Sequence, residues 1–441
     1  MNFIVELFMN KQEIYTYSDI LNSKPYNLYS NGDLIEGINL FSGLVNTNPH
    51  DSNIWVELGF AHLKNIDFKM AKLCFDTAIQ INPKNSSAIC ALGLYHYESG
   101  NFKDAKYYYN NTLEIDKNSE WAKLNLSLLE QTSGNYSKGL SLYEEREKKR
   151  CLLLHENLKH EQIPELKDLR FLEKNKSILI IGEQGFGDQM MICLYLKKLQ
   201  SLNINISYLI NEKLYPFLKN IKEIDKIKII KTISEKEMKT FDFKIFSMSL
   251  PFLFHKKKIK RSKLKISNLS LNKNFDNYPS KVKELLSQKK IFVALAWSGR
   301  NSQVRNSYRS IRLKFFNKIL DNSKLNFFVM QKISNKEDLE IINNTKNFHD
   351  FSNYLNDFSD TAFLLSKMDL TISTCTSLAH LSGLLYKKTY LLLSMIHDPR
   401  WIKNNNGILY DNLKVFKQKE LNNWHHPLEE INKLLRHKNN S

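Results

Sequence analysis

The chain has 441 residues, which corresponds to about two to three domains and is ample for sizeable cores. Its 64 basic and 46 acidic residues give a formal net charge of +18, so an anionic partner is expected; Lys- and Asn-rich usage that reflects nucleotide bias is the alternative explanation. The five cysteines are scattered without a C-x-x-C pair, which argues against a disulfide framework or a zinc cluster and favours a reducing compartment.

The N-terminal segment, residues 1–27, makes a poor signal peptide. Its apolar stretch Phe3–Met9 is interrupted by Glu6 and lacks both a basic leader and a small-residue cleavage site. No apolar run in the chain approaches the roughly 18 residues that a membrane span needs. We therefore expect a cytoplasmic protein, with peripheral contact to an anionic membrane surface as an additional partner.

Residues 28–150 carry an internal repeat. Several landmarks recur at a step of 34 residues, namely Asn48-Pro49, Asn82-Pro83 and Asp116-Lys117, and also Gly32, Ile66, Gly100 and Gly134. This step is the period of tetratricopeptide repeats, and small residues between large apolar ones would let paired helices approach closely. The segment resembles that family over about three and a half units. Such arrays bind a protein partner on their concave face, although packing or dimerisation is the alternative for a short array fused to an enzyme.

The array is followed by a charged run, Glu147–Arg150, which we interpret as a solvated helix end. Residues 151–176 contain Pro164 and are predicted to be a connector that lies over the next domain. From residue 177 onward the helix pairs give way to alternating strands and helices, so the pattern predicts two successive α/β domains with mainly parallel sheets.

The stretch Ser177–Leu199 is the most informative part of the chain. Its apolar run Ile178–Ile181 predicts a buried strand, three glycines come next within six residues (Gly182, Gly185 and Gly187), and Asp188 stands where a helix should begin. The spacing fits neither the dinucleotide fingerprint nor a P-loop. We interpret it as an α/β ligand-binding corner, with a plain turn capped by Asp188 as the alternative.

The N-terminal α/β domain is assigned to 177–265, a linker to 266–289 and the C-terminal α/β domain to 290–441. Strands are predicted at 178–181, 204–210, 227–230, 243–246, 291–297, 326–330, 370–373 and 389–393. Helices are predicted near 188–200, 213–220, 313–320, 362–367 (capped by Ser359-Asp360-Thr361) and 377–385. The basic tract Lys256–Lys265 is interpreted as a solvated linker face, with a patch for phosphate or anionic lipid as the alternative.

Seven ordered motifs resemble those of bacterial tetratricopeptide-containing glycosyltransferases, whose catalytic half is similar to the heptosyltransferase family (glycosyltransferase family 9). They are Glu183-Gln184-Gly185-Phe186-Gly187-Asp188, Ala296-Trp297-Ser298-Gly299, Tyr308-Arg309-Ser310-Ile311, Phe328-Val329-Met330-Gln331-Lys332, Asp357–Ala362, Ser373–Gly383 and Asp398-Pro399-Arg400-Trp401. The resemblance implies a tetratricopeptide α-solenoid followed by a GT-B fold, that is, two Rossmann-like domains with the donor nucleotide held mainly by the C-terminal one. It also implies transfer of a hexosyl or heptosyl group from a nucleotide-sugar to a protein or glycan acceptor.

The resemblance assigns roles to individual residues. Asp188 matches the catalytic base of an inverting transfer, with a helix cap alone as the alternative. The donor-binding residues would be Ser298, Gly299, Arg309, Thr374, Cys375, Thr376, Ser377 and His380. Arg309 and the start of the helix near Ser377 would hold the diphosphate, whereas a histidine simply packed in the domain is the alternative for His380. No D-x-D motif is present, so we expect a metal-independent enzyme without a cofactor.

Two departures from the family pattern concern the donor side. Cys375 stands where the family commonly has an aspartate, and Pro399 stands where an aromatic residue is common. The main alternative is therefore a repeat scaffold whose transferase half has lost its chemistry. Nucleic-acid binding would explain the charge, but no recognisable module is present and aromatic residues are not interleaved with the basic tract, so nucleic acid is not expected as a partner.

Overall fold

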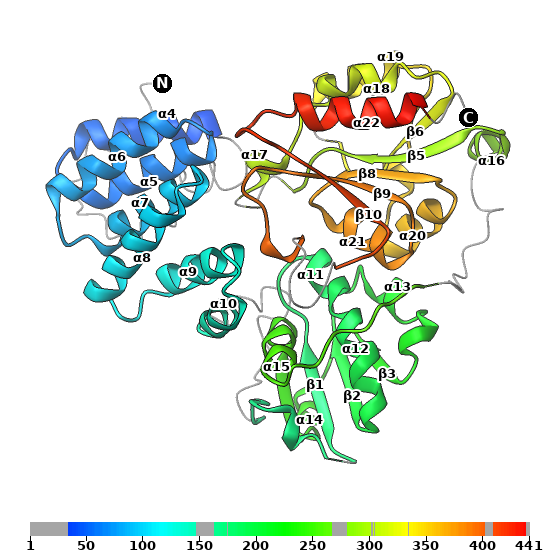
Figure 1. Cartoon of the computed structure of the whole chain (residues 1–441), viewed down its shortest axis with the longest axis horizontal. Coiled ribbons are helices and arrows are strands. Elements are labelled where there is room, and N and C mark those ends of the chain that lie inside the picture. The colour runs from blue at the N-terminus through cyan, green and yellow to red at the C-terminus, as the bar shows by residue number, and fades with distance from the viewer. Residues whose placement is uncertain are drawn as a thin grey trace. The chain divides into compact units, whose positions relative to one another are not determined.

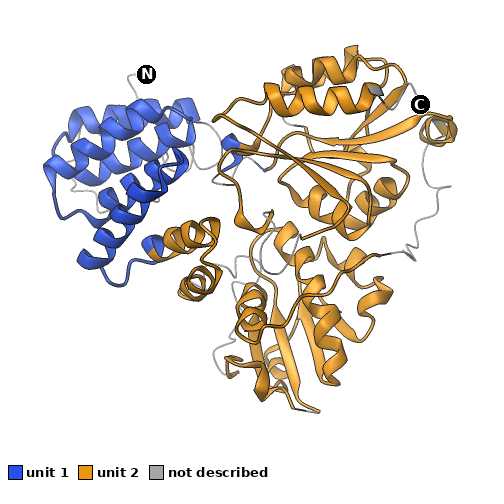
Figure 2. Cartoon of the chain, viewed as in Figure 1, with its two compact units in different colours: residues 1–122, 300–308 blue, residues 123–299, 309–441 orange. Residues whose placement is uncertain are grey.

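The computed structural model describes residues 34–146, 163–173, 175–266, 280–300, 303, 305–333, 335–401 and 409–437. The chain divides into two compact units (Figure 2): the first comprises 1–122 and 300–308, and the second comprises 123–299 and 309–441. The predicted N-terminal segment, the charged run 147–150, part of the connector (151–162 and 174) and residues 267–279 of the linker lie outside the described residues. The predicted fold class, helical repeats followed by α/β domains, is confirmed.

Seven helices make up the described part of the repeats (Figure 1). They are α4 (Leu34–Thr47), α5 (Ser52–Lys64), α6 (Phe68–Ile81), α7 (Ser86–Glu98), α8 (Phe102–Ile115), α9 (Glu120–Thr132) and α10 (Tyr136–Tyr143). Asp and Asn side chains fix several of the starts: Asp67 accepts from the Met70 amide at 3.1 Å and Asn85 from the Ala88 amide at 3.1 Å. These bonds satisfy amides that would otherwise lack partners in the first helical turn.

Three of the 34-residue landmarks share one backbone conformation. Ile66, Gly100 and Gly134 have φ angles of 63°, 81° and 87°, in the left-handed region. Each ends the first helix of a repeat, and the next amide reaches back five residues, as from Asn101 to the His96 carbonyl at 2.8 Å. This is the closing bond of a Schellman-type helix end, which favours glycine. Ile66 adopts the same turn although a β-branched residue is disfavoured there.

Close helix packing explains two other glycines of the repeats. A Cβ added at Gly59 would lie 2.4 Å from the Phe75 ring, and one added at Gly93 would lie 2.5 Å from the Tyr109 ring. Both rings are fully buried. The pairing of a glycine with a large ring therefore recurs at the 34-residue step and sets how closely the helices approach.

The first sheet belongs to the second unit. Its strands are β1 (Ser177–Ile181), β2 (Asn205–Leu209), β3 (Ile227–Ile230) and β4 (Phe243–Phe246), in the order β3-β2-β1-β4 and all parallel. Its helices are α11 (Phe186–Met191), α12 (Cys193–Leu199), α13 (Tyr215–Leu218), α14 (Glu235–Met238) and α15 (Leu250–Lys256). The four predicted strands are confirmed, whereas the helix predicted near 188–200 is two short helices separated at Ile192.

The described end of the connector pairs with the outer side of β4. The Leu166 amide donates to the Lys244 carbonyl at 2.8 Å, and the Lys244 amide donates to the Pro164 carbonyl at 2.9 Å. Glu165 thereby forms a parallel bridge with Lys244. This short segment extends the sheet by one position beyond its last named strand.

The second sheet also belongs to the second unit and is parallel throughout. Its strands are β5 (Ile291–Ala296), β6 (Leu325–Val329), β7 (Phe348–Asp350), β8 (Leu370–Thr374), β9 (Thr389–Leu393) and β10 (Leu413–Lys417), in the order β10-β9-β8-β5-β6-β7. The helices in this part of the chain are α16 (Ser280–Ser287), α17 (Asn306–Arg309), α18 (Asn317–Leu320), α19 (Lys336–Asn344), α20 (Phe358–Ser366), α21 (Ser377–Leu384) and α22 (His425–His437). Strands β7 and β10 were not predicted.

Two helix predictions in this half need correction. The segment predicted as one helix at 313–320 begins as a 3-10 turn, Leu313–Phe316, and becomes α-helical only in α18. Helix α20 starts at Phe358, not at Ala362, because Asp357 is the cap: its carboxylate accepts from the Ser359 and Asp360 amides at 2.7 and 3.1 Å. The predicted cap Ser359-Asp360-Thr361 is therefore the first turn of the helix.

The basic tract 256–265 begins at the end of α15 and continues as a segment without helix or strand. Its Ser262 amide donates to the Leu194 carbonyl of α12, and the Ile266 amide just beyond it donates to the Leu384 carbonyl of α21, both at 2.9 Å. Leu264 and Ile266 are buried, whereas most lysines of the tract are exposed. The lysines thus form a solvated face over an apolar underside. None of the described helices is both long and apolar enough to cross a membrane.

Replacement by alanine should have opposite effects on the free energy of unfolding at two exposed glycines, Gly100 and Gly43. Gly100→Ala is expected to lower the free energy of unfolding by about 1 kcal/mol, because a Cβ is disfavoured at positive φ. Gly43 lies inside α4 with nothing within 4 Å of an added Cβ, so Gly43→Ala should raise it by roughly 0.5–1 kcal/mol. Urea midpoints followed by circular dichroism measure both, and equal shifts of the two variants would contradict the prediction.

Candidate functional site

The glycine corner lies between the end of β1 and the start of α11, at the carboxyl edge of the first sheet. Its left-handed residue is Gln184, with φ of 62°, and not one of the three glycines as their positions suggested. The glycines serve close approach instead. A Cβ at Gly182 would lie 2.6 Å from the Leu209 carbonyl oxygen, and one at Gly187 would lie 2.5 Å from the His380 ring. The space at Gly187 is therefore filled by a side chain of the protein.

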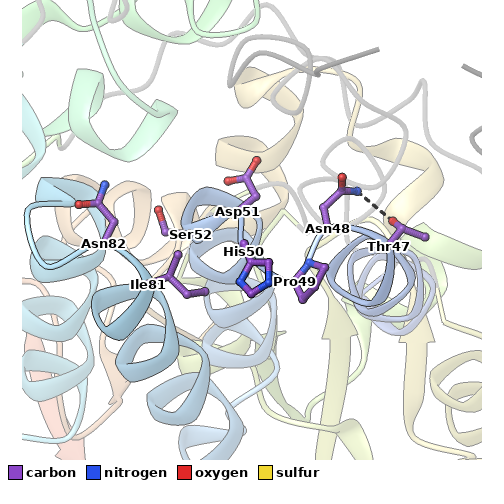
Figure 3. Close-up of a pocket in the computed structure, with 8 residues that line it drawn as sticks. All are labelled: Thr47, Asn48, Pro49, His50, Asp51, Ser52, Ile81 and Asn82. Carbon is purple, nitrogen blue, oxygen red and sulfur yellow. Dashed lines mark hydrogen bonds between the residues drawn. The ribbon is translucent and has the colours of Figure 1, made fainter. Parts of the chain in front are cut away.

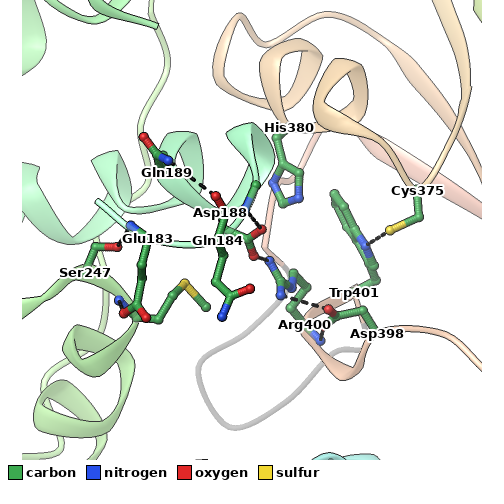
Figure 4. A network of polar contacts seen from close by, with 12 residues as sticks. Glu183, Gln184, Asp188, Gln189, Ser247, Cys375, His380, Asp398, Arg400 and Trp401 are labelled. Carbon is green, nitrogen blue, oxygen red and sulfur yellow. Dashed lines mark hydrogen bonds and ion pairs between the residues drawn. The ribbon is translucent and has the colours of Figure 1, made fainter. Parts of the chain in front are cut away.

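Asp188 uses both carboxylate oxygens (Figure 4). Oδ2 accepts from the Gly185 amide at 3.0 Å, which is the capping bond of α11, and Oδ1 forms an ion pair with the Arg400 guanidinium. The side chain is 19% exposed, so a ligand can reach it. The helix therefore begins at Phe186 with Gly185 as its cap residue, and not at Asp188 as predicted; Asp188 lies in the first turn, where its carboxylate takes part in the capping and also pairs with Arg400.

Arg400 links Asp188 to the second sheet. It lies beyond the end of β9, and its Nη2 also pairs with Asp398 Oδ2 at 2.8 Å. Burial disfavours the charge of Arg400, but the two carboxylates raise its pKa well above the ordinary value. Burial alone would raise the pKa of Asp398, yet the neighbouring Arg400 lowers it. Arg400 and Asp398 are therefore charged, and one guanidinium is shared between two carboxyl side chains.

His380 is a packed histidine. It is 4% exposed, its Nδ1 lies 3.1 Å from the Tyr410 hydroxyl, and its ring lies 4.5 Å from the Trp401 ring, centroid to centroid. Burial lowers the pKa of His380 to about 3, with the Arg400 charge as a smaller cause. The imidazole is neutral at pH 7 and abuts Gly187, so it shapes the corner around Asp188.

Arg309 lies beside the start of α21. Its Nη1 donates to the Cys375 carbonyl at 2.6 Å, two residues before Ser377, the first residue of the helix. Thr376 is the cap residue, but its side chain makes no capping hydrogen bond. Cys375, Thr376 and Ser377 are partly exposed, whereas Thr374 is fully buried. The structure thus brings together most of the predicted diphosphate residues and removes Thr374 from the accessible surface.

The Cys375 thiol is held by Trp401. The indole Nε1 donates to Cys375 Sγ at 3.0 Å. Burial raises the pKa of Cys375 above its ordinary value, so the thiol is neutral and does not supply the negative charge of the aspartate that the resemblance led us to expect at this position. No group of three or more His, Cys, Asp and Glu side chains that could hold a metal ion is found in the described ranges.

Ser298 and Gly299 come one residue after the end of β5, and β5 neighbours β8 in the sheet. Gln331, just after β6, fixes this turn: its Oε1 accepts from the Trp297 and Ser298 amides at 2.8 and 3.1 Å, and its Nε2 donates to Ser298 Oγ at 2.9 Å. Ser298 is thus placed at the carboxyl edge of the second sheet. Gln331 belongs to one of the sequence motifs, but it was not predicted as a site residue.

A buried ion pair fixes the other side of the corner. Arg146, shortly after α10, meets Glu183 through two bonds, Nη2 to Oε1 at 2.6 Å and Nε to Oε2 at 3.1 Å. The side chains of Arg146 and Glu183 are 3% and 0% exposed. Glu183 Oε1 also accepts from the Met248 amide at 2.8 Å. Arg146 directly precedes the charged run 147–150, which was expected to be solvated, yet the Arg146 side chain is buried.

A separate hollow of about 630 Å³ lies on the repeats (Figure 3). It is lined by the turns that come after α4 and α6, including Asn48, Pro49, His50, Asp51 and Asn82. Three of the lining residues, Asn48, Pro49 and Asn82, belong to the repeating Asn-Pro landmarks. None of the predicted site residues lies in it.

No protein-family model matches the sequence, and no curated protein matches it. Among solved structures, the chain is similar to a glycosyl transferase family 9 protein from Veillonella parvula DSM 2008 (10% identity, covering 60% of this chain and 92% of that chain, TM-score 0.41). It is also similar to E. coli ADP-heptose lps heptosyltransferase II (10%, 60% and 99%, TM-score 0.38) and to the TPR protein YrrB (16%, 35% and 79%, TM-score 0.26). These likenesses include both classes that the sequence motifs resemble.

The Arg146–Glu183 pair predicts unequal effects for the two glutamates bound to one arginine. Glu183→Gln leaves the buried Arg146 charge without its main partner and should cost about 3–5 kcal/mol of unfolding free energy. Glu144 pairs with the same guanidinium at 3.0 Å but is 20% exposed, so Glu144→Gln should cost about 1 kcal/mol or less. Denaturant unfolding measures both; comparable losses would show that the Glu183 bonds are not the dominant ones.

Buried His380 predicts a loss of stability in mild acid. Its pKa is about 3 in the folded chain against an ordinary value of 6.5, so between these values only the unfolded chain binds the proton. The stabilisation is complete above pH 6.5 and is lost as the pH falls toward 3, by about 2 kcal/mol between pH 7 and pH 5.

The measurement is the urea midpoint as a function of pH for the wild type, His380→Gln and His50→Gln. His380→Gln should remove this part of the slope, because it removes the group that titrates. His50 is exposed, so His50→Gln serves as the control and should keep the wild-type slope. A slope that His380→Gln leaves unchanged would show that other groups account for the acid sensitivity.

Proposed function

We propose that this chain is a glycosyltransferase that moves a sugar from a nucleotide-sugar to an acceptor hydroxyl. The supporting observation is the Asp188–Arg400 ion pair, which joins a carboxylate from the carboxyl edge of the first sheet to a cation from the carboxyl edge of the second. Ligands of open parallel sheets bind at these edges. At these edges Asp188 can act as a base and Arg400 can bind phosphate. Together they would support transfer of a sugar from a phosphorylated donor to a hydroxyl.

In the proposed reaction Asp188 acts as the general base. Its carboxylate takes the proton of the acceptor hydroxyl while the hydroxyl oxygen attacks the anomeric carbon. The bond from that carbon to the diphosphate oxygen breaks, and the leaving nucleoside diphosphate keeps the electron pair. Attack from the opposite face inverts the anomeric configuration.

The leaving diphosphate needs positive charge and hydrogen-bond donors. Arg309 beside the start of α21 can supply the first, and the backbone amides in the first turn of that helix can supply the second. Arg400 is a further candidate, because a bound diphosphate would compete with Asp188 for its guanidinium. Such an exchange would release Asp188 as a base only when the donor is present. These groups would serve in place of a divalent ion.

The proposal also defines the partners of the enzyme. The donor is a nucleotide-sugar, and the acceptor is a protein or a glycan that the repeats could help to select. We propose a cytoplasmic location, with the exposed lysines of residues 256–265 available to an anionic membrane surface. The Cys375 thiol supports the second candidate, a repeat scaffold without transferase activity, because the site lacks the aspartate common in the family.

A panel of donors separates the two candidates. ADP-, GDP-, UDP-, CMP- and dTDP-linked sugars are added to the protein in a thermal-shift assay, where a donor at a hundred times its Kd should add about 2.7 kcal/mol of stability. We expect one nucleotide class to stabilise the wild type. Arg309→Ala should abolish the shift, because it removes a diphosphate contact.

Asp188→Asn should keep the shift but reduce transfer by roughly 10²- to 10⁴-fold, because the amide cannot act as a base; its oxygen can still accept from the Gly185 amide, and Arg400 keeps its pair with Asp398. Asp76→Asn, at an exposed carboxylate of α6, is the matched control and should behave like the wild type. If no donor shifts the folded wild type, the scaffold is the correct alternative.

A further inference from the structure

Gln331 comes two residues after the end of β6 and contacts the turn that follows the neighbouring strand, β5 (Figure 1). Its Oε1 accepts from two backbone amides, those of Trp297 and Ser298, at 2.8 and 3.1 Å. A backbone N–H can only donate, so the atom that meets both amides has to be the side-chain oxygen. The amide nitrogen Nε2 therefore faces the Ser298 hydroxyl, 2.9 Å from Oγ. The chemistry of its partners thus fixes which way the Gln331 amide points.

This orientation determines the direction of the hydrogen bond at Ser298. A hydroxyl has one hydrogen to donate and lone pairs that accept, whereas a side-chain NH2 group only donates. Because Nε2 donates, Ser298 Oγ is the acceptor, and its own hydrogen takes no part in this bond. Among the residues that the structure describes, no other group accepts that hydrogen, and Ser298 is partly exposed. The hydroxyl is thus left to donate to a ligand, and the bond from Gln331 strengthens it as a donor.

Further contacts hold the same turn in place. Trp297 is 1% exposed, and its indole Nε1 donates to Asp338 Oδ2 at 2.8 Å. The Trp297 carbonyl accepts from the Ile311 amide, also at 2.8 Å. Ser298 therefore follows a residue that is bound through its side chain, its amide and its carbonyl. A hydroxyl presented from so fixed a backbone loses little conformational freedom when a ligand binds to it.

The Ser298 hydroxyl and the proposed diphosphate residues belong to the same edge of the second sheet. Ala296 of β5 is paired with Ser373 of β8, so Ser298 and Cys375 each lie two residues beyond one pair of partners. Neighbouring strands are about 4.8 Å apart. The Cys375 carbonyl is the group that accepts from Arg309. A phosphate bound at this carboxyl edge would therefore have a cation and a hydroxyl donor from adjacent strand ends.

We propose that Gln331 is a positioning residue, which directs the hydrogen of the Ser298 hydroxyl toward a phosphate oxygen of the bound nucleotide. This inference rests on the proposed function, because it takes the ligand at this edge to be a nucleotide-sugar. An ionised phosphate oxygen only accepts hydrogen bonds, so it matches a hydroxyl whose hydrogen is left for the ligand. Gln331 itself does not touch the nucleotide and acts through Ser298.

The test is calorimetric binding of ADP, GDP, UDP, dTDP and CMP to the full chain. Ser298→Ala removes the hydroxyl and should weaken binding about tenfold or more, because a hydrogen bond to a charged group is lost. Gln331→Glu keeps an oxygen for the two backbone amides but replaces Nε2 by a second oxygen, so the Ser298 hydrogen turns toward the carboxylate and away from the ligand. Gln288→Glu is the control, since it adds the same charge at an exposed residue before β5, at the opposite edge of the sheet, and should bind like the wild type.

The double variant Ser298→Ala/Gln331→Glu separates the loss of the hydroxyl donor from simple repulsion by the added charge. We expect Gln331→Glu to weaken binding by a smaller factor in the Ser298→Ala background than in the wild type, because the donor is already absent there. Circular dichroism confirms that each protein is folded at the temperature used. Equal factors in the two backgrounds would overturn the role of Gln331, and unchanged binding by Ser298→Ala would overturn the inference as a whole while leaving the proposed function intact. If none of the nucleotides binds the wild type, the proposed function fails and this inference fails with it.

Discussion

The candidate site depends on the charge of Arg400, which holds the carboxylates of Asp188 and Asp398 at the same time. Without this cation the two side chains would lose the positive charge that holds them to the same guanidinium. Because Asp188 also accepts the Gly185 amide, one side chain ties the local turn of the first sheet to the loop beyond β9. The corner around Asp188 is therefore defined by electrostatics at least as much as by its glycines.

Two further arginines of the chain also form ion pairs with buried carboxylates. Arg146 meets Glu183 beside the corner, and Arg305 meets Glu98 on the repeats. Taking such charges out of water offsets much of their attraction, so these pairs add little net stability, but a buried charge that loses its partner is costly. Each pair instead fixes the position of its own segment of the chain. In both cases a glutamate that is almost inaccessible selects the position of a flexible basic side chain.

Repeats and strands could be predicted from the sequence, whereas ion pairs between residues far apart in the chain could not. The 34-residue period and the apolar runs were sufficient to locate the repeats and eight strands, because each signal lies within a short window. Strand β10 was missed because only Phe416 is buried in it, and β7 because it has only three residues. Asp188 was found from its glycine corner. Arg400, Arg146 and Arg305 were not, since their partners lie 212, 37 and 207 residues away and leave no local pattern.

The pairing of residues 164–166 with β4 has a consequence for self-association. An edge strand presents free amides and carbonyls that can recruit a strand of another molecule. On β4 the Lys244 amide and carbonyl are already occupied by Pro164 and Leu166. At the opposite edge, β3 displays the exposed Lys228, a charge that disfavours stacking of strands between molecules. Because residues 164–166 are synthesised before β4, the segment that covers this edge is available as soon as the strand emerges, which disfavours aggregation of a sheet rich in β-branched residues while it folds.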